Sequence, residues 1–311
     1  MTEIFLTIFF ITVLLLFLGS GIWVAISMIG VSSIGMILFT TRPVGDAMAT
    51  TIWGASSSWT LTALPLFVWM GEILFRTKLS ENLFEGLSPW MQKLPGGLVH
   101  VNVVGCALFA AISGSSAATV ATVGKMSIPE LRKRKYPEGI LLGSLAGSGT
   151  LGLLIPPSII LIIYGVTVQE SIAKLFIAGV LPGIMIALIF MTYVIIWSSI
   201  NKKLMPVSKQ NFSFIEKFRK SGKLIPVILL ILSVIGSIYT GIATATEAAS
   251  LGVVGALILS YFQKSLTLKT FKASLLGATK TSCMIAFILA GATFLSLAMG
   301  FTGLPRNLAI W

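Results

Sequence analysis

The chain has 311 residues, of which 56% are apolar and 10% charged, and its mean hydropathy is +0.98. Because an ordinary soluble domain has about 25% charged residues, this composition excludes a soluble globular protein. The net charge of +12 does not indicate nucleic-acid binding, because the cations lie between apolar runs and are not gathered on one solvated face. The sequence therefore indicates a protein that lies in the lipid bilayer.

Apolar runs recur along the whole chain, and each membrane crossing needs about 20 apolar residues. The first run has Glu3 where a secretory signal carries basic residues, so it is predicted to be a helix of the mature protein. Eight spans are predicted, near residues 4–18, 20–40, 59–76, 139–166, 173–199, 224–240, 244–262 and 271–299.

The stretch between the third and fourth spans has a different pattern. Residues 79–93 are amphipathic and are predicted to form an interfacial helix. Residues 97–124 are apolar but are interrupted by small residues, which predicts a re-entrant helical hairpin that enters and leaves on one side. With the N-terminus outside and this hairpin not crossing, 19 of the 22 Lys and Arg residues fall on the inner side. This asymmetry is the one expected of a membrane protein, and it supports the hairpin.

A weak internal repeat relates two parts of the chain. The helix pair at 4–40 can be laid on the pair at 224–262, and residues 65–71 then align with residues 285–291. Five predicted crossings separate the two copies, so the second copy would be inverted in the membrane. Inverted repeats with broken helices are typical of secondary transporters.

The hairpin holds the first group of candidate functional residues, at 109–119, where Ser113 to Ser116 are four consecutive small residues. Such a run lets the backbone unwind, and unwound backbone at membrane depth is tolerated only where it is buried or lines a polar cavity. Its carbonyls and hydroxyls then become available as ligands. The alternative reading is close helix packing through small residues.

The fourth span holds the second group. Pro156 lacks the N–H that would bond the carbonyl of Gly152, and Pro157 lacks the one for Leu153. Both carbonyls are therefore predicted to be free, although a simple proline kink is the alternative. Oxygen ligands of this kind suit a hard cation such as Na+. The two interrupted elements could meet near the midplane and share one ion, and the half-helix N-termini there would favour a carboxylate substrate.

Four motifs resemble the large membrane subunit of the TRAP transporters, the tripartite ATP-independent periplasmic family. They are the runs at residues 94–98, 109–119, 149–158 and 244–249. The resemblance implies an all-α polytopic membrane protein of the bacterial cell inner membrane, an inverted-repeat elevator-type transporter with a re-entrant hairpin and a broken transmembrane helix. It also implies Na+-coupled import of an organic acid, such as a sialic acid or a C4-dicarboxylate. The implied partners are a periplasmic substrate-binding protein and a small four-helix membrane subunit.

The resemblance also implies a sodium site. Its ligands would be the hydroxyls of Ser113 and Ser116 and the carbonyls of Gly152, Ile155 and Pro157. Substrate contacts are predicted at Ser115, Gly149 and Thr150, which lie in the same two motifs.

The repeat predicts four segments. They are 1–96, the scaffold helices and interfacial arm; 97–172, the hairpin and broken helix; 173–223, a linking helix and basic cytoplasmic loop; and 224–311, the first part of the second repeat. The family's second hairpin has no counterpart before Trp311, so the sequence looks truncated at that point.

Two other functions are alternatives to a transporter. A passive channel would not need a sodium gradient. An intramembrane enzyme could use a hairpin serine as nucleophile, but Lys280 is the only remote candidate for its base. No nucleotide motif and no Cys/His constellation occurs, so we predict that the chain is not an enzyme. Glu247 is either functional or a helix-terminal carboxylate, and Glu72 is expected to pair with Arg76.

Overall fold

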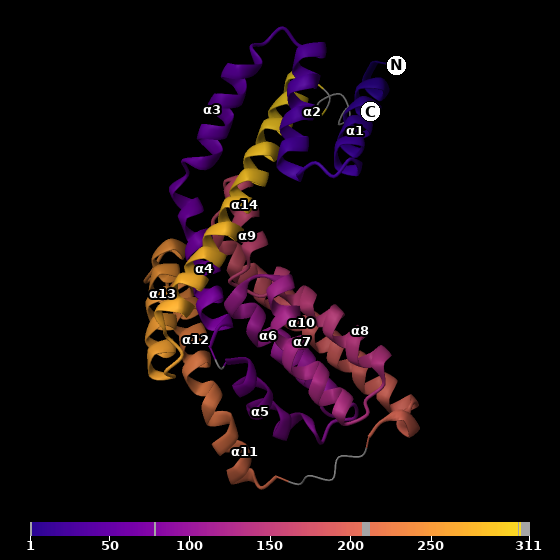
Figure 1. Cartoon of the computed structure of the whole chain (residues 1–311), viewed down its shortest axis with the longest axis vertical. Coiled ribbons are helices and arrows are strands. Elements are labelled where there is room, and N and C mark those ends of the chain that lie inside the picture. Colours follow the sequence, from indigo (N-terminus) through magenta and orange to yellow (C-terminus); the bar gives the residue numbers. More distant parts are fainter. Residues whose placement is uncertain (1, 78, 207–211, 304, 306–311) are drawn as a thin grey trace. The chain divides into compact units, whose positions relative to one another are not determined.

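The structure of the chain, a computed structural model, describes residues 2–77, 79–206, 212–303 and 305 (Figure 1). Every regular element in these ranges is helical. The chain divides into two compact units, one formed by Met1–Leu61 with Lys280–Trp311 and the other by Thr62–Thr279. This confirms the all-α fold, and the several apolar helices are those of a polytopic membrane protein.

The first unit has four helical parts. They are α1 (Thr2–Gly19), α2 (Val24–Phe39), α3 (Val44–Ser56) and the second part of α14 (Leu268–Phe301). The ring of Phe10 covers Gly35, where a side chain would leave no room for it. Met36 of α2 and Phe294 and Ala298 of α14 are fully buried together and form the unit's core.

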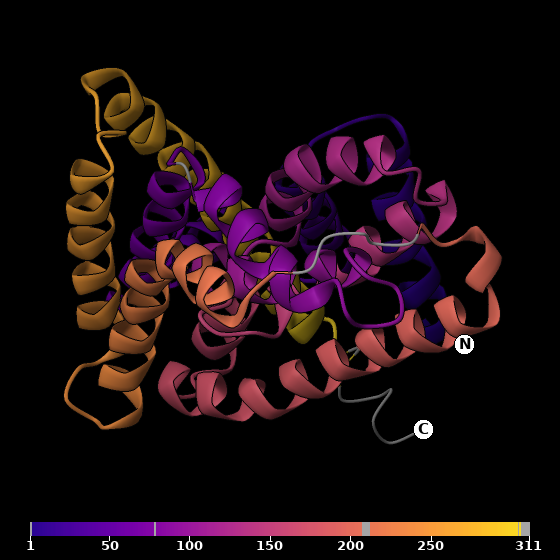
Figure 2. The same cartoon turned by 90° about the horizontal axis from the view of Figure 1, so that it is seen from below.

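The second unit contains most of the helices. They are η1 (Trp59–Thr62) at its boundary, α4 (Ala63–Phe75), α5 (Leu79–Met91), α6 (Val99–Ser113), α7 (Ser116–Lys133), α8 (Glu138–Gly149), η2 (Thr150–Leu153), α9 (Ile159–Val168), α10 (Ile172–Ile200), η3 (Lys202–Leu204), α11 (Phe214–Ser221), η4 (Gly222–Leu224), α12 (Ile225–Tyr239), α13 (Ala245–Phe262) and the first part of α14. The hairpin α6–α7 packs against α8, and α4 packs along α13. Figure 2 shows α10 as a long unbroken helix and α12 beside α13.

Three of the described helices, α10, α13 and α14, are long and apolar enough to cross a bilayer by themselves. The number rises to five if two interrupted helix pairs each form one span, α3 with η1 and α4, and α11 with α12. Several other predicted spans are shorter apolar helices. The eight crossings therefore stay a prediction, as do the inverted repeat and the placement of the hairpin in the bilayer.

Two helices were not expected from the sequence. Helix α3 is 13 residues long and contains Asp46, Thr50 and Thr51, so it is too short to form a predicted span by itself. Helix α11 lies in the predicted basic loop, which was not expected to be helical because it is highly charged. The helix begins with a capping box, in which Ser213 and Glu216 bond each other's backbone. Helix α14 is also longer at both ends than the predicted span at 271–299.

The hairpin and the broken helix have the predicted form. The hairpin is two helices joined by a tight turn, and α7 continues past residue 124 to Lys133. The two compact units are defined by contacts within the fold, so they do not test the four segments expected from the repeat. Those segments stay a prediction. Trp311, where the second repeat was expected to stop, lies outside the described residues.

Candidate functional site

The hairpin tip is built from residues that suit a tight turn. Helix α6 ends at Ser113, and Gly114 follows with a φ of 58°, a left-handed conformation that glycine adopts without strain. The Gly114 amide donates to the carbonyl of Ala110 at 3.0 Å. Ser115 then caps α7, and its hydroxyl accepts from the amide of Ala118 at 3.4 Å. The chain therefore reverses within two residues.

The fourth predicted span is fully interrupted and not merely kinked. Helix α8 tightens into the 3-10 turn η2, and residues 154–158 have no regular structure before α9 begins at Ile159. The peptide bond between Pro156 and Pro157 is cis. The double proline thus ends one half-helix and precedes the next, as the sequence predicts.

The hairpin tip and the break lie directly against each other. The amide of Ile159 donates to the carbonyl of Gly114 at 3.3 Å. A Cβ atom on Gly114 would lie 2.6 Å from the carbonyl oxygen of Pro157, and one on Gly152 would lie 2.8 Å from the amide nitrogen of Ser116. Backbone meets backbone at both contacts, so both positions require glycine. The two interrupted elements are therefore in direct backbone contact.

The hydroxyls at the tip have unequal surroundings. The Oγ of Ser113 lies 3.1 Å from the Oγ1 of Thr119, and Thr119 donates to the carbonyl of Ser115 at 2.7 Å. The Oγ of Ser116 is buried and has no hydrogen-bond partner among the described residues. A buried hydroxyl without a partner costs about 1–3 kcal/mol. It is therefore a group that a bound ion or water would satisfy.

One predicted ligand group is already bonded. The Oγ of Ser158 donates to the carbonyl of Leu153 at 2.7 Å, so the expectation that this carbonyl is free is wrong. The sequence signal was present, because a serine directly after two prolines can bond back to the preceding turn. In a continuous helix the amide of residue 156 would donate to the carbonyl of Gly152. Pro156 has no N–H, so it cannot make this bond.

The structure brings together Ser113, Ser115, Ser116, Gly152 and Pro157, which are five of the eight predicted site residues. Of the other three, Gly149 also lies near this contact, because a Cβ there would be 3.8 Å from the carbonyl oxygen of Ser116. The side chain of Ile155 packs towards Gly183 of α10, Gly149 lies against Val120 of α7, and the exposed Thr150 donates to the carbonyl of Gly147 at 2.7 Å. At Ile155 and Gly149 only the backbone could supply a ligand, and the hydroxyl of Thr150 is already hydrogen-bonded.

Glycines on α4 and α10 allow these two helices to pack closely against the hairpin tip and the break. A Cβ on Gly179 of α10 would lie 2.8 Å from the carbonyl oxygen of Leu154, and one on Gly183 would lie 2.8 Å from Ile155. A Cβ on Gly71 of α4 would lie 2.9 Å from the Cα of Ser113. The sequence reading missed the α10 pair, although two small residues four positions apart are a known signal of close helix packing.

The ionisable residues discussed from the sequence have structural roles. Glu247 forms a capping box at the start of α13, where its Oε2 accepts from the amide of Thr244 at 2.8 Å. Glu72 pairs with Arg76 at 2.9 Å, as predicted. In the described part of the chain no three His, Cys, Asp or Glu side chains gather as a metal site would need. Any cation at the hairpin contact would therefore be held by hydroxyls and carbonyls.

The sequence of the chain is similar to known transporter subunits. Residues 10–311 match the family described as the DctM component of the tripartite ATP-independent periplasmic transporter. The chain is 33% identical to a C4-dicarboxylate TRAP transporter large permease protein of Pseudomonas aeruginosa, over 91% of this chain and 66% of that protein. It is 32% identical to a sialic acid TRAP transporter large permease protein of Vibrio cholerae, over 94% of this chain and 68% of that protein.

A third relative has a longer chain. It is the isethionate TRAP transporter permease protein DctMQ of Oleidesulfovibrio alaskensis, and it is 32% identical over 94% of this chain and 46% of its own length. The present chain thus spans about two thirds or less of these three relatives. All three are named as transporter permeases and none as an enzyme.

Proposed function

Because the chain belongs to the DctM family of tripartite ATP-independent periplasmic transporters, we propose that it imports an organic acid across the bacterial inner membrane, driven by Na+. The single observation that carries the sodium part is the contact between the hairpin tip and the break. There the buried hydroxyl of Ser116 has no hydrogen-bond partner in the part of the chain that the structure describes, and the backbone of Ser116 meets Gly152.

The proposed sodium ligands are oxygen atoms only. They are the hydroxyls of Ser113 and Ser116 and the carbonyls of Gly152, Ile155 and Pro157. Oxygen donors without sulfur or imidazole suit a hard, weakly polarising cation. Hydroxyls and unwound carbonyls at a helix break are also how transporters bind Na+. This donor set supports Na+ as the coupled ion.

The ends of two half-helices support an acidic substrate. Helix α7 begins at Ser116 and α9 begins at Ile159, and both starts lie at the contact. A helix N-terminus carries partial positive charge and unbonded amides, so it favours a carboxylate. Ser115, Gly149 and Thr150 are proposed to face the substrate. Relatives are named for C4-dicarboxylates, sialic acid and isethionate, which are all acids or their anions.

The hairpin and the broken helix are proposed to move together as the transport body of an elevator mechanism. Their support is the bond from Ile159 to Gly114 and the two glycine contacts, which tie the elements at the backbone. A periplasmic substrate-binding protein would deliver the acid, and a small four-helix membrane subunit would stand beside this chain. The fused name DctMQ of one relative is consistent with a second membrane subunit.

The test is uptake by proteoliposomes that hold the full-length product of the locus, its small subunit and its binding protein. We expect uptake of labelled sialate or succinate only with an inward Na+ gradient and the binding protein present. Ser116→Ala should raise the Na+ concentration for half-maximal uptake about tenfold or more, as expected for the loss of one oxygen ligand that contributes about 1.4 kcal/mol to Na+ binding.

The matched control is Thr122→Val, because the Thr122 hydroxyl bonds only the carbonyl of Ala118 one turn back in α7. It should leave the sodium dependence unchanged. Uptake that is indifferent to Na+ in the unchanged protein would overturn the coupling and favour a passive channel. Equal sodium dependence in Ser116→Ala and the unchanged protein would remove Ser116 from the site.

A further inference from the structure

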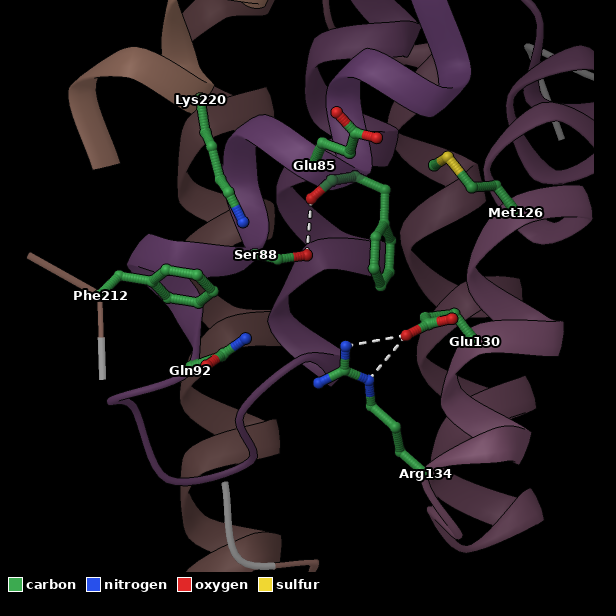
Figure 3. Close-up of a pocket in the computed structure, with 9 residues that line it drawn as sticks. Glu85, Ser88, Gln92, Met126, Glu130, Arg134, Phe212 and Lys220 are labelled. Carbon is green, nitrogen blue, oxygen red and sulfur yellow. Dashed lines mark hydrogen bonds and ion pairs between the residues drawn. The ribbon is translucent and has the colours of Figure 1, made fainter. Parts of the chain in front are cut away.

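A second cavity, away from the hairpin tip, lies between α5, the end of α7 and the start of the α11 region. Its volume is about 340 Å³, and its walls include Ser88 of α5, Arg134 after α7 and Lys220 of α11 (Figure 3). The helices α5 and α7, and α5 and α11, pack against one another around it. Three elements that are far apart in the sequence thus share one polar hollow.

Two cations reach into this cavity from opposite walls (Figure 3). The Nζ of Lys220 lies 4.2 Å from the ring centre of Phe212. The Nε and Nη2 of Arg134 both bond the Oε1 of Glu130 at 2.8 Å, which leaves its Nη1 edge for another acceptor. Glu130 is neutralised by Arg134, and Glu85 lies at the end of the cavity opposite Arg134 (Figure 3). The four charged side chains of the wall, Lys220, Arg134, Glu130 and Glu85, sum to zero, so an anion here would be held by the Lys220 ammonium and the Nη1 edge of Arg134.

The surroundings place this cavity at the surface of a bilayer. Helix α11 exposes Phe214, Ile215 and Phe218 by 67%, 77% and 58%. The ring of Trp90 lies 6.2 Å from that of Phe214 and 5.9 Å from that of Phe218, and the Nζ of Lys217 lies 5.3 Å from the same Trp90 ring. A short helix with exposed aromatic residues on one side and lysines on the other lies at the headgroup level.

We propose that this cavity binds the phosphate group of an anionic phospholipid from the cytoplasmic leaflet. Lys220 and Arg134 contact the phosphate, and the acyl chains run along the exposed side chains of Phe214, Ile215 and Phe218. The leaflet follows from the Lys and Arg distribution, which puts this region on the inner side, and basic residues there attract anionic lipids. The bound lipid would bridge α5, α7 and α11.

The test is native mass spectrometry of the full-length chain, purified in a mild detergent. The chain is titrated with dioleoyl phosphatidylglycerol, with dioleoyl phosphatidylcholine and with inorganic phosphate. We expect a phosphatidylglycerol adduct that binds at least threefold more tightly than phosphatidylcholine. Lys220→Gln should weaken this adduct at least threefold, and Arg134→Gln should weaken it as much or more.

Two variants on the same elements are matched controls. Lys217→Gln removes a lysine from α11 that lies over Trp90 and does not line the cavity. Arg132→Gln removes an arginine of α7 that pairs with Glu138 outside the cavity. Both should leave the adduct within a factor of two of the unchanged chain. Lys220 is exposed, so Lys220→Gln is expected to fold and decides the test if Arg134→Gln does not.

Three results would overturn the proposal. The first is equal lipid binding by Lys220→Gln and the unchanged chain. The second is an equal loss in Lys217→Gln, which would mean diffuse attraction by the whole basic surface. The third is displacement of the lipid by millimolar inorganic phosphate, which would make the cavity a site for a soluble anion. None of these results depends on whether the hairpin site transports an acid.

Discussion

At the scale of single residues, Ser116 offers the sharpest test, because its hydroxyl is buried and none of the described residues bonds it. Ser116→Ala removes a group whose burial costs about 1–3 kcal/mol. We therefore expect the variant to be as stable as the unchanged chain, or more stable, in Na+-free buffer. The additional stability that Na+ gives the unchanged chain should be lost. Melting temperatures in sodium chloride and in choline chloride measure both effects.

The neighbouring Thr119 serves as the contrast for this measurement. Its hydroxyl bonds the carbonyl of Ser115 at 2.7 Å and contacts Ser113. Thr119→Val should therefore destabilise the chain in both salts, by about 0.5–1.5 kcal/mol. If Ser116→Ala were as destabilising as Thr119→Val in choline chloride, the Ser116 hydroxyl would have a partner that the described structure does not contain.

Gly152 tests the contact between the two interrupted elements. In Gly152→Ala the new methyl group would lie 2.8 Å from the Ser116 amide and 3.0 Å from the Ser115 carbonyl carbon, and neither backbone can yield easily. We expect a loss of about 1–3 kcal/mol in the free energy of unfolding, measured by denaturant titration in detergent.

Gly143, one helix earlier in α8, is the matched control because nothing lies within 4 Å of its would-be Cβ. Gly143→Ala should stabilise the helix by up to about 1 kcal/mol, since alanine has the higher helix propensity. An equal effect of both substitutions would contradict the close approach at Gly152.

A pH-dependent ion pair links the end of α7 to the start of α8. The Arg132 guanidinium donates to both carboxylate oxygens of Glu138, at 2.7 and 3.1 Å, and holds the pKa of Glu138 below its usual value of 4.5. Its stabilising effect is therefore present above the pKa of the unfolded chain and is lost as the pH falls through the folded pKa. Glu138→Gln should lower the melting temperature slightly at pH 7. The difference should vanish when the pH is taken well below 4.5.

A difference that persisted at low pH would show that Glu138 stabilises the helix start by something other than its charge. The effect at neutral pH is expected to be small, because both side chains are 55% exposed and salt screens such pairs. Raising the salt concentration should reduce it further.

At the scale of elements, the double proline is the feature that keeps the Gly152 carbonyl available. Pro156→Ala would supply an amide at position 156, and this amide can donate to the Gly152 carbonyl as it would in a continuous helix. We expect Na+ to protect the variant less against heat than it protects the unchanged chain. Pro129→Ala in α7 adds a helical amide at a distance from the break, so it should not change the effect of Na+.

The sequence predicted these two elements because their signals are local. Four consecutive small residues at Ser113–Ser116 and the prolines at 156 and 157 interrupt otherwise apolar runs, and the structure has a turn and a break at these places. Which groups each break leaves free was less predictable. The Leu153 carbonyl is bonded by Ser158, and the Ile155 side chain packs towards α10, because tertiary neighbours decide both.

The two helices that the sequence did not predict show what a hydropathy pattern cannot detect. A hydropathy search detects long apolar stretches, so the 13-residue helix α3 and the charged helix α11 were missed even though each is a regular helix. Helix α11 has a capping box that a search for Ser followed three residues later by Glu would find. Its packing against Trp90 could not be read from the sequence, because the two segments are more than a hundred residues apart.

At the scale of the whole molecule, each compact unit pairs helices that the predicted repeat assigns to different copies. In the second unit, α4, the third membrane helix of the first copy, packs along α13, the second helix of the second copy. In the first unit, α14, the third helix of the second copy, packs against α2, the second helix of the first copy. A Cβ on Gly291 would lie 2.9 Å from the carbonyl oxygen of Ala25. The repeat itself stays a prediction.

The core of the first unit gives a prediction at this scale. Phe294→Ala removes a fully buried ring from the contact with Met36, and truncations of this kind cost about 3–5 kcal/mol. We expect faster amide hydrogen exchange in α2 and in residues 285–301. Exchange in α6 and α8 should stay unchanged, because their core lies in the second unit. Faster exchange across both units would show that they unfold as one.

The bond from Ile159 to Gly114 also sets an order of events during synthesis. The ribosome makes the hairpin first, and the partner of its tip arrives about 45 residues later, roughly 2–9 s at bacterial rates of elongation. In that interval the Ser113–Ser116 turn has been made, but the break that will cover it has not. The polar groups of the nascent tip therefore lack this partner until the double proline and Ile159 have been made.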